Sequence, residues 1–269
     1  MNIGCALFCA FVAVSTGGLA MAGENRVDVP FVSLAGDVVA SGNPVGDDGR
    51  IHKVTVPAVR LMRTDAKNAK GTILLFPGGG YSILAIQHEG DMTARFLNAQ
   101  GFDVAILEYH VSAGPTTRDL ALEDALAAFR LLKSRAKSFG LHGNRLGIMG
   151  YSAGGHLAAR TVQHLKADEQ PDYLVLIYPA YLQENLPNTN TPAVKPPAKP
   201  AGRLFALIAA NDKKEWVESC RDYSGKWKAN GGSAVFHLLS AGGHGFGMKS
   251  GLTPPALTWP DLLKEFLQQ

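Results

Sequence analysis

The 269-residue sequence predicts a single α/β domain built on a mostly parallel, doubly wound sheet with antiparallel strands at its N-terminal side. Three observations predict this class. Two early stretches alternate apolar and polar residues, six short and fully apolar runs follow them, and helical segments separate those runs. Fully apolar runs are typical of parallel strands covered on both faces. Their alternation with helices implies right-handed crossovers within one sheet.

The first 22 residues, MNIGCALFCAFVAVSTGGLAMA, form an apolar run that ends in small residues. This pattern predicts a secretory signal peptide with cleavage near Ala22, although no Lys or Arg precedes the run. A retained membrane anchor is the alternative, but the run is short, is broken by Gly17 and Gly18, and lacks a positive flank. We expect one catalytic domain over 23–269 that is secreted or periplasmic and has no membrane contact after cleavage.

The composition excludes several classes of protein. With 46% hydrophobic and 18% charged residues the chain is an ordinary globular protein. The net charge is only +3 and the basic residues are scattered, so no nucleic-acid surface is expected. Two of the three cysteines, Cys5 and Cys9, lie in the predicted signal. Only Cys220 would remain, which excludes an internal disulfide in the mature chain.

The early alternating stretches at 26–32 and 53–62 predict antiparallel strands at a sheet edge, a position that tolerates Pro30 and Pro57. In the second stretch four apolar residues are expected on one face: Val54, Val56, Val59 and Leu61.

The six apolar runs predict parallel strands at 72–76, 102–107, 145–149, 173–178, 203–209 and 234–239. Helices are predicted at 91–100, 120–140, 153–166, 215–230 and 259–267. One segment, 187–200, is rich in proline, threonine and asparagine and has no periodicity. We interpret it as a loop within the domain, because the alternation of strands and helices resumes after it.

The stretch Gly150-Tyr-Ser-Ala-Gly154 lies where an apolar run turns into a predicted helix. G-x-S-x-G in that position is the signature of a nucleophile elbow. The serine backbone is strained there, and a side chain at either glycine would crowd the turn. We therefore predict that Ser152 is a catalytic nucleophile at the positive end of a helix. The alternative is a tight turn without chemical function.

A nucleophilic serine needs a base and an acid, which follow it in that fold in the order acid and then histidine. Asp212 follows the run 203–209 directly, and His244 lies in a glycine-rich loop after 234–239. We predict Asp212 as the orienting acid, with Glu215 in reserve, and His244 as the general base.

Acyl transfer also needs donors for a tetrahedral oxyanion. The loop F76-PGGGY81 follows a strand and matches the HGGG type, with Pro77 in place of histidine. We predict that the backbone N–H groups of Gly79, Gly80 and Ala153 form the oxyanion hole. The loop lacks the spacing of a phosphate-binding loop. No metal or cofactor is expected, because no ligand spacing such as HExxH is present.

From about Thr72 onward the sequence resembles the secreted α/β-hydrolase esterases of the acetylxylan and feruloyl esterase type. The resemblance rests on PGGGY at 77–81, HEG at 88–90, the block 122–159 that ends in the elbow, and GGHGFG at 242–247. It implies an acyl-enzyme on Ser152 and an acylated polysaccharide or oligosaccharide of plant hemicellulose as substrate, with acetyl groups expected first and feruloyl groups as the alternative.

Tyr81 and Tyr151 flank the predicted oxyanion loop and nucleophile, and we predict that they bind substrate. The alternative is that both only pack against neighbouring loops. The loop 187–200 follows a strand end, so we expect it to border the cleft. Two other functions stay open: a serine peptidase on the same scaffold, and a non-catalytic binding protein that keeps the fold. The sequence does not determine the oligomeric state.

Overall fold

The structure is a computed structural model, and it describes residues 31–67, 69–112, 114–142, 144–183 and 193–269. The predicted signal peptide at 1–22 lies outside these ranges, as do the first residues of the predicted strand at 26–32.

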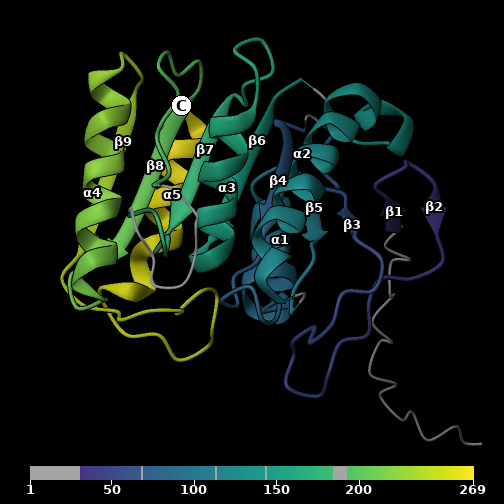
Figure 1. The fold of residues 1–269 in the computed structure, drawn as a ribbon, viewed down its shortest axis with the longest axis horizontal. Helices are drawn as coiled ribbons and strands as arrows, with labels where there is room; N and C mark the ends of the chain where they lie inside the picture. Colours follow the sequence, from purple (N-terminus) through teal and green to yellow (C-terminus); the bar gives the residue numbers. More distant parts are fainter. Residues whose placement is uncertain (1–30, 68, 113, 143, 184–192) are drawn as a thin grey trace, which may run out of the picture.

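A nine-stranded mixed sheet forms the centre of the fold, in the order β2-β1-β3-β5-β4-β6-β7-β8-β9 (Figure 1). Three strands pair antiparallel at its N-terminal side, and the remaining six pair parallel. The strands are β1 (Phe31–Ser33), β2 (Val38–Val39), β3 (Ala58–Met62), β4 (Gly71–Phe76), β5 (Phe102–Glu108), β6 (Leu146–Tyr151), β7 (Tyr173–Ile177), β8 (Arg203–Ala209) and β9 (Ala234–Leu239). The predicted fold class is confirmed.

The strand order reverses at β4. The chain moves from β4 to β5 on one side and then returns past β4 to β6. Such a reversal opens a crevice at the carboxyl ends of the strands, which is where open α/β sheets bind ligands. The parallel register of β4 and β6 pairs Phe76 with Gly150, so the loops that follow these two strands start side by side.

Helices cover both faces of the sheet. They are α1 (Met92–Ala99), α2 (Thr117–Arg135), α3 (Ser152–His164), α4 (Lys214–Ala229) and α5 (Trp259–Gln268), and α1 is preceded by a π-helical turn η1 (Ile86–Asp91). In Figure 1, α3 and α4 lie in front of the strands β6 to β9, whereas α5 lies behind them. Edge contacts of Trp259 with Tyr151, and a ring contact of Phe266 with Phe205, attach α5 to the sheet.

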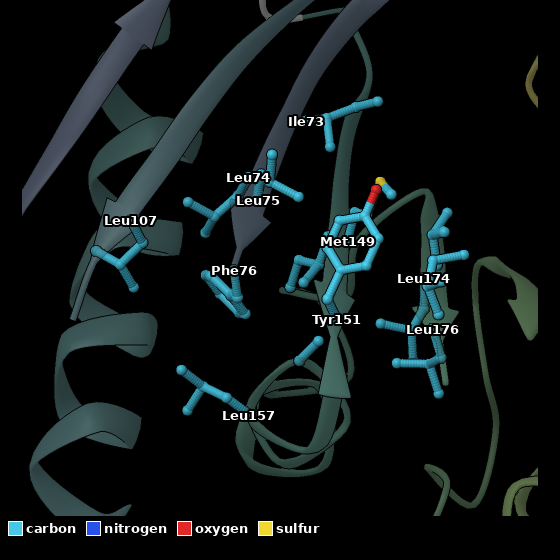
Figure 2. Packing of buried hydrophobic residues seen from close by; sticks show 14 of the residues in the cluster. Ile73, Leu74, Leu75, Phe76, Leu107, Met149, Tyr151, Leu157, Leu174 and Leu176 are labelled. Atoms are coloured by element: carbon cyan, nitrogen blue, oxygen red, sulfur yellow. The ribbon is translucent and has the colours of Figure 1, made fainter. Parts of the chain in front are cut away.

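The core lies between these layers, where every residue of β4, β5 and β7 is buried. Figure 2 shows the side chains of β4, β6 and β7 in contact, with the Tyr151 ring among them. Burial of a large apolar side chain contributes about 1.5 to 3 kcal/mol, so this core holds the carboxyl ends of the strands in fixed positions.

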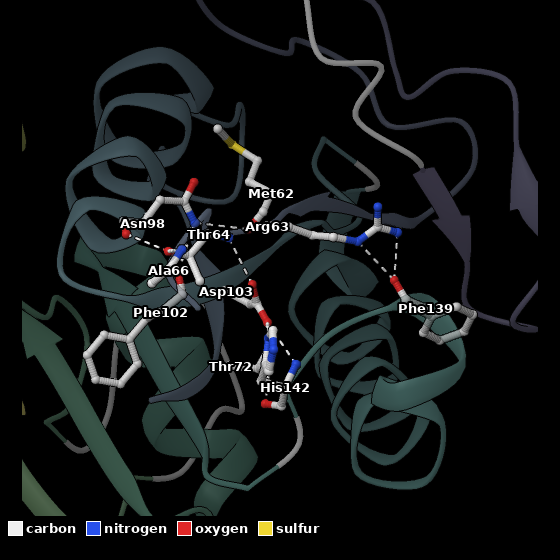
Figure 3. Close-up of polar contacts among 10 residues, drawn as sticks. All are labelled: Met62, Arg63, Thr64, Ala66, Thr72, Asn98, Phe102, Asp103, Phe139 and His142. Carbon is white, nitrogen blue, oxygen red and sulfur yellow. Dashed lines mark hydrogen bonds and ion pairs between the residues drawn. The ribbon is translucent and has the colours of Figure 1, made fainter. Parts of the chain in front are cut away.

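Polar contacts at the amino-terminal end of β5 stabilise the end of the sheet that lies opposite the carboxyl ends of the parallel strands (Figure 3). The buried Asp103 carboxylate accepts the backbone N–H of Thr64 at 2.9 Å and that of His142 at 2.7 Å, and it also contacts the His142 ring. Arg63 donates to the carbonyl of Phe139. Asp103 therefore fixes the loops before β4 and β6 on the side of the sheet remote from Ser152.

The N-terminal prediction was partly wrong. The strand begins at Ala58 rather than at residue 53, and the two-residue β2 was not predicted. Val54, Val59 and Leu61 are buried, but Val56 is 58% exposed. The alternation at 53–57 therefore belongs to a connecting segment that pairs with no strand, and in such a segment side chains need not alternate between two faces.

Candidate active site

Ser152 lies at a sharp turn from β6 into α3. Tyr151 is still extended, with φ −110° and ψ 136°, whereas Ser152 has φ 50° and is already the first residue of the helix. A positive φ at a non-glycine residue costs on the order of 1–3 kcal/mol, and residues strained in this way cluster at functional sites. The turn places the Ser152 side chain at the N-terminal end of α3, where the helix dipole favours negative charge.

The glycines of the motif are required by close backbone contacts. A Cβ at Gly150 would collide with the carbonyl oxygen of Gly154, and a Cβ at Gly154 would collide with the carbonyl oxygens of Phe76 and Pro77. The second contact matters more for the site, because it shows that α3 packs directly on the first residues of the PGGG loop.

Ser152, His244 and Asp212 form one chain of hydrogen bonds. Ser152 Oγ lies 2.7 Å from His244 Nε2, and His244 Nδ1 lies 2.7 Å from Asp212 Oδ2. A carboxylate only accepts hydrogen bonds, so the proton of a neutral imidazole is on Nδ1 and Nε2 is left to accept the serine hydroxyl. The arrangement can therefore remove a proton from Ser152.

Burial differs along this chain. The Asp212 side chain is 1% exposed, whereas that of His244 is 28% exposed. Asp212 is held from its other oxygen as well, because Oδ1 accepts the N–H of Lys213 at 2.7 Å. Water is excluded from the carboxylate but reaches the imidazole, as a base that passes protons to and from a substrate requires.

Aromatic rings support the base. The Trp216 ring centroid lies 4.6 Å from that of His244, and the Tyr178 centroid lies 5.1 Å away at a steep angle. Gly243, next to the histidine, donates its N–H to the side chain of Asn211 at 2.8 Å. The imidazole therefore lies between two buried rings on a loop that is tied to the end of β8.

The predicted oxyanion loop has a defined backbone. Gly79 and Gly80 have φ values of 138° and 65°. The Gly78 carbonyl accepts from Ala85 at 2.9 Å, and the Gly79 carbonyl accepts from Ser82 at 3.0 Å. Since a trans peptide holds its C=O and N–H in opposite directions, both carbonyl contacts fix the directions of the N–H groups of Gly79 and Gly80. In the part of the chain that is described, neither N–H has a recorded acceptor.

Comparison with known proteins agrees with this geometry. Residues 73–211 match the family of the alpha/beta hydrolase fold. The chain belongs to this α/β-hydrolase family. It is 36% identical over 103 residues, 38% of this chain, to an acetylxylan esterase of Xylanibacter ruminicola, and 30% identical over 132 residues, 48% of this chain, to an ethyl acetate hydrolase of Pseudomonas putida. These matches cover only 21% and 41% of those two proteins.

Two solved structures have the same fold. An acetyl ester-xyloside bifunctional hydrolase from Caldicellulosiruptor lactoaceticus is 27% identical, with a TM-score of 0.66 over 79% of this chain and 88% of that one. An α/β hydrolase, MGS-M1, from a Medee basin deep-sea metagenome library is 23% identical, with a TM-score of 0.67 over 85% of this chain and 96% of that one. The second likeness concerns the fold alone.

The prediction that Tyr151 binds substrate in this α/β-hydrolase was wrong. Its side chain is fully buried, its hydroxyl lies 2.9 Å from Thr93 Oγ1, and its ring contacts Tyr178 and Trp259. The residue before the elbow is the last of strand β6, and its side chain points into the core among the residues of Figure 2.

Tyr81 is also mostly interior, with 5% of its surface exposed. Its hydroxyl lies 2.7 Å from Nδ1 of the buried His156, and the Arg118 guanidinium lies over its ring. Burial lowers the pKa of His156 well below its usual value, so the ring is neutral. These contacts support the alternative that Tyr81 only packs against its neighbours. Its bond to His156 joins the predicted oxyanion loop to α3.

Several neighbours of the candidate catalytic residues were not predicted. Tyr178 follows β7 directly, Trp216 lies in the first turn of α4, and Glu89 lies in the π-helical turn η1. The run Y178-P-A-Y181 at a strand end and the HEG stretch were the available signals. Of these, only HEG contributes to the prediction, as part of the resemblance.

Part of the predicted loop at 187–200 lies outside the described residues. In its described part, Lys195 donates its N–H to Gln163 of α3 at 3.0 Å, and the Pro197 carbonyl accepts from Asn230 at 2.7 Å. Its predicted position beside the cleft stays a prediction.

The described ranges contain no helix with the length and hydropathy of a membrane span. They also contain no group of three or more His, Cys, Asp or Glu side chains placed to hold a metal ion.

Proposed function

We propose that this chain is a serine-dependent carboxylic ester hydrolase that removes acyl groups from xylan or its oligosaccharides. The observation that carries the proposal is the continuous chain of hydrogen bonds from Ser152 Oγ through His244 to the buried Asp212. A nucleophile, a base and an orienting acid in this geometry are the parts that acyl transfer requires.

In the proposed reaction, His244 Nε2 takes the Ser152 proton as Oγ attacks the ester carbonyl. The N–H groups of Gly79, Gly80 and Ala153 receive the developing oxyanion. His244 then gives the proton to the departing sugar oxygen, which leaves an acyl group on Ser152. Water, deprotonated by the same nitrogen, attacks this acyl-enzyme, and collapse of the second tetrahedral intermediate releases the acid and restores the serine. No cofactor is consumed.

The substrate class is supported by relatives rather than by the site itself. Residues of this chain are similar to an acetylxylan esterase and, at 30% identity over 105 residues, to an endo-1,4-beta-xylanase B of Butyrivibrio fibrisolvens, of which the match covers 16%. The similar solved hydrolase acts on acetyl esters and xylosides according to its name. We therefore propose acetyl esters first and keep feruloyl esters as the alternative.

Export is part of the proposal, because polysaccharides lie outside the cell. Its basis is the apolar run before Gly23. N-terminal sequencing of the protein from medium or periplasm tests it: Gly23 as the first residue supports removal of a signal peptide, and an intact Met1 contradicts it.

The test of function measures acetic and ferulic acid released from acetylated and feruloylated xylan by the full chain and by Ser152→Ala. Release by the parent that falls to the background in the variant supports the proposal and identifies the acyl group. If neither releases acid while small activated esters are cleaved through Ser152, xylan is the wrong substrate. Cleavage of peptide amides faster than esters would favour a peptidase.

A further inference from the structure

Glu89 connects the two halves of the candidate site. Its Oε2 accepts the N–H of Gly78 at 2.6 Å, and its Oε1 accepts the Tyr178 hydroxyl at 2.8 Å. Gly78 begins the oxyanion loop, and the Tyr178 ring packs on His244 with centroids 5.1 Å apart. One carboxylate thus contacts the loop that would bind the oxyanion and the ring that supports the base.

Within the described ranges no lysine or arginine forms an ion pair with Glu89, although the charge of Lys249 acts on it without an ion pair, and burial raises the pKa of its carboxyl group. Glu89 is 2% exposed, and within the described ranges its only recorded ion pair is with His88, at 3.8 Å. Burial lowers the pKa of His88 to about 4, so that ring is neutral at pH 7. A buried acid without a cation partner is costly, and such groups cluster at functional sites.

The Gly78 contact acts on the peptide unit that orients the loop. The carbonyl of the Pro77–Gly78 peptide accepts the Tyr109 hydroxyl at 2.5 Å, while its N–H is held by Glu89. A Cβ built on Gly78 would lie 2.9 Å from the Ser152 Cβ, so this peptide is directly beside the nucleophile. A rotation here would turn the N–H groups of Gly79 and Gly80 away from their present directions.

The loop that carries His244 also lies against Glu89. A Cβ at Gly247 would lie 3.1 Å from Glu89 Cγ, and Met248 donates its N–H to the carbonyl of His88 at 3.0 Å. Glu89 lies in the π-helical turn η1, and π-turns within helices occur frequently at functional sites.

We propose that Glu89 is a positioning residue that holds the Gly78 peptide and the Tyr178 ring in register, so that the oxyanion donors and His244 meet the same substrate carbonyl. This inference rests on the proposed function. It assigns Glu89 no contact with substrate. The proposed role depends on the length of the Glu89 side chain, which lets it contact both Gly78 and Tyr178, and not on its charge.

A matched pair of variants separates reach from charge. Glu89→Gln keeps the length: its oxygen accepts from Gly78, and its amide donates to the Tyr178 hydroxyl. Glu89→Asp keeps the charge but is one methylene shorter, so it cannot span both partners. We expect Glu89→Asp to lower kcat about 100-fold with KM changed less than about threefold, and Glu89→Gln to stay within about tenfold of the parent.

Two measurements and one control variant make the result decisive. Steady-state kinetics on p-nitrophenyl acetate give kcat and KM, and the rate of Ser152 labelling by a fluorophosphonate reports the same machinery without any assumption about xylan. Asp103→Asn, a buried carboxylate at the far end of β5, is the control: its Tm should fall while its kcat stays unchanged.

Parental rates in Glu89→Asp would overturn the proposal, as would an equal loss in Glu89→Asp and Glu89→Gln. A rise in KM at unchanged kcat would show binding of the ground state instead and would also overturn it. If the parent cleaves no ester at all, the proposed function fails, whereas the order of the labelling rates still tests Glu89.

Discussion

Replacing Asp212 by asparagine should disable His244 without moving it. Asp212 Oδ1 accepts the Lys213 N–H, and Oδ2 accepts from His244 Nδ1, each at 2.7 Å. The oxygen of an asparagine would keep the Lys213 contact, because an amide NH₂ cannot accept. Its NH₂ then faces Nδ1 as a donor. The imidazole must respond by carrying its proton on Nε2, where it no longer accepts the Ser152 hydroxyl.

The magnitude follows from this change of tautomer. Because the Asp212 side chain is 1% exposed, water cannot replace the lost acceptor. The same substitution at an orienting aspartate of a serine triad costs about 10⁴-fold in kcat, so we expect kcat/KM for p-nitrophenyl acetate to fall by about 10³- to 10⁴-fold, which is about 4 to 5.5 kcal/mol of barrier. Melting curves should show a folded protein.

Glu215→Gln is the control, because Glu215 is exposed in the first turn of α4 and was the reserve candidate for the acid. It should retain the parental kcat/KM. A loss below tenfold in Asp212→Asn, or a large loss in Glu215→Gln instead, would refute the assignment of Asp212.

Two further predictions concern the packing around the site. Gly154→Ala places a methyl against the Phe76 and Pro77 carbonyls, so we expect activity to fall at least about 100-fold and Tm to drop; parental kinetics would show that α3 does not restrain the oxyanion loop. Burial lowers the pKa of His88 from 6.5 to about 4, so only the unfolded chain gains a proton there between those pH values, and folded stability falls as the pH falls through that window. In His88→Asn the loss of unfolding free energy between pH 7 and 4.5 should be smaller by about 2 kcal/mol, since the ring is only half-buried; equal losses in both proteins would contradict this.

The sequence predicts the centre of the fold well because its signals are local. Each parallel strand is a continuous apolar run, and each helix between them has its own period. The N-terminal edge is predicted less well. There, Val54 and Val56 have the alternating spacing of a strand, yet both lie in a connecting segment. A strand and a connecting segment with this spacing differ only in whether they pair with a neighbouring strand, and the apolar pattern does not encode that pairing.

The residues of the candidate site also differ in whether local sequence predicts them. The sequence was sufficient to predict three residues, Ser152, Asp212 and His244. Each of them follows its own strand, and each is of a residue type that has few other roles at such a position. The position of Glu89 could not be predicted, because the HEG stretch does not show whether its carboxylate is buried or solvated. Its place depends on Gly78 and Tyr178, which lie in the loops after β4 and β7. Tyr151 was assigned by proximity to Ser152, although it is the last residue of β6, and side chains on both faces of that strand are buried.

Backbone strain shows why these distant contacts matter. Among the described residues, five non-glycine residues have positive φ, and four of them follow the carboxyl ends of β4, β6 and β7: Tyr81, Ser152, Tyr178 and Tyr181. Each costs on the order of 1–3 kcal/mol, so each persists only where its surroundings leave no alternative. The Tyr178 hydroxyl is bonded to Glu89, and its N–H donates to the carbonyl of Leu207 at 2.6 Å. The backbone carbonyl of Ser152 accepts the N–H of Ala180, which lies between the strained residues Tyr178 and Tyr181. The loop after β7, which carries two of these positions, is therefore bonded to Glu89, to β8 and to the elbow at Ser152, so a change at Glu89 can reach the elbow through this loop. This coupling is the reason to expect that shortening Glu89, which touches neither Ser152 nor His244 by a hydrogen bond, lowers the rate of a reaction at both.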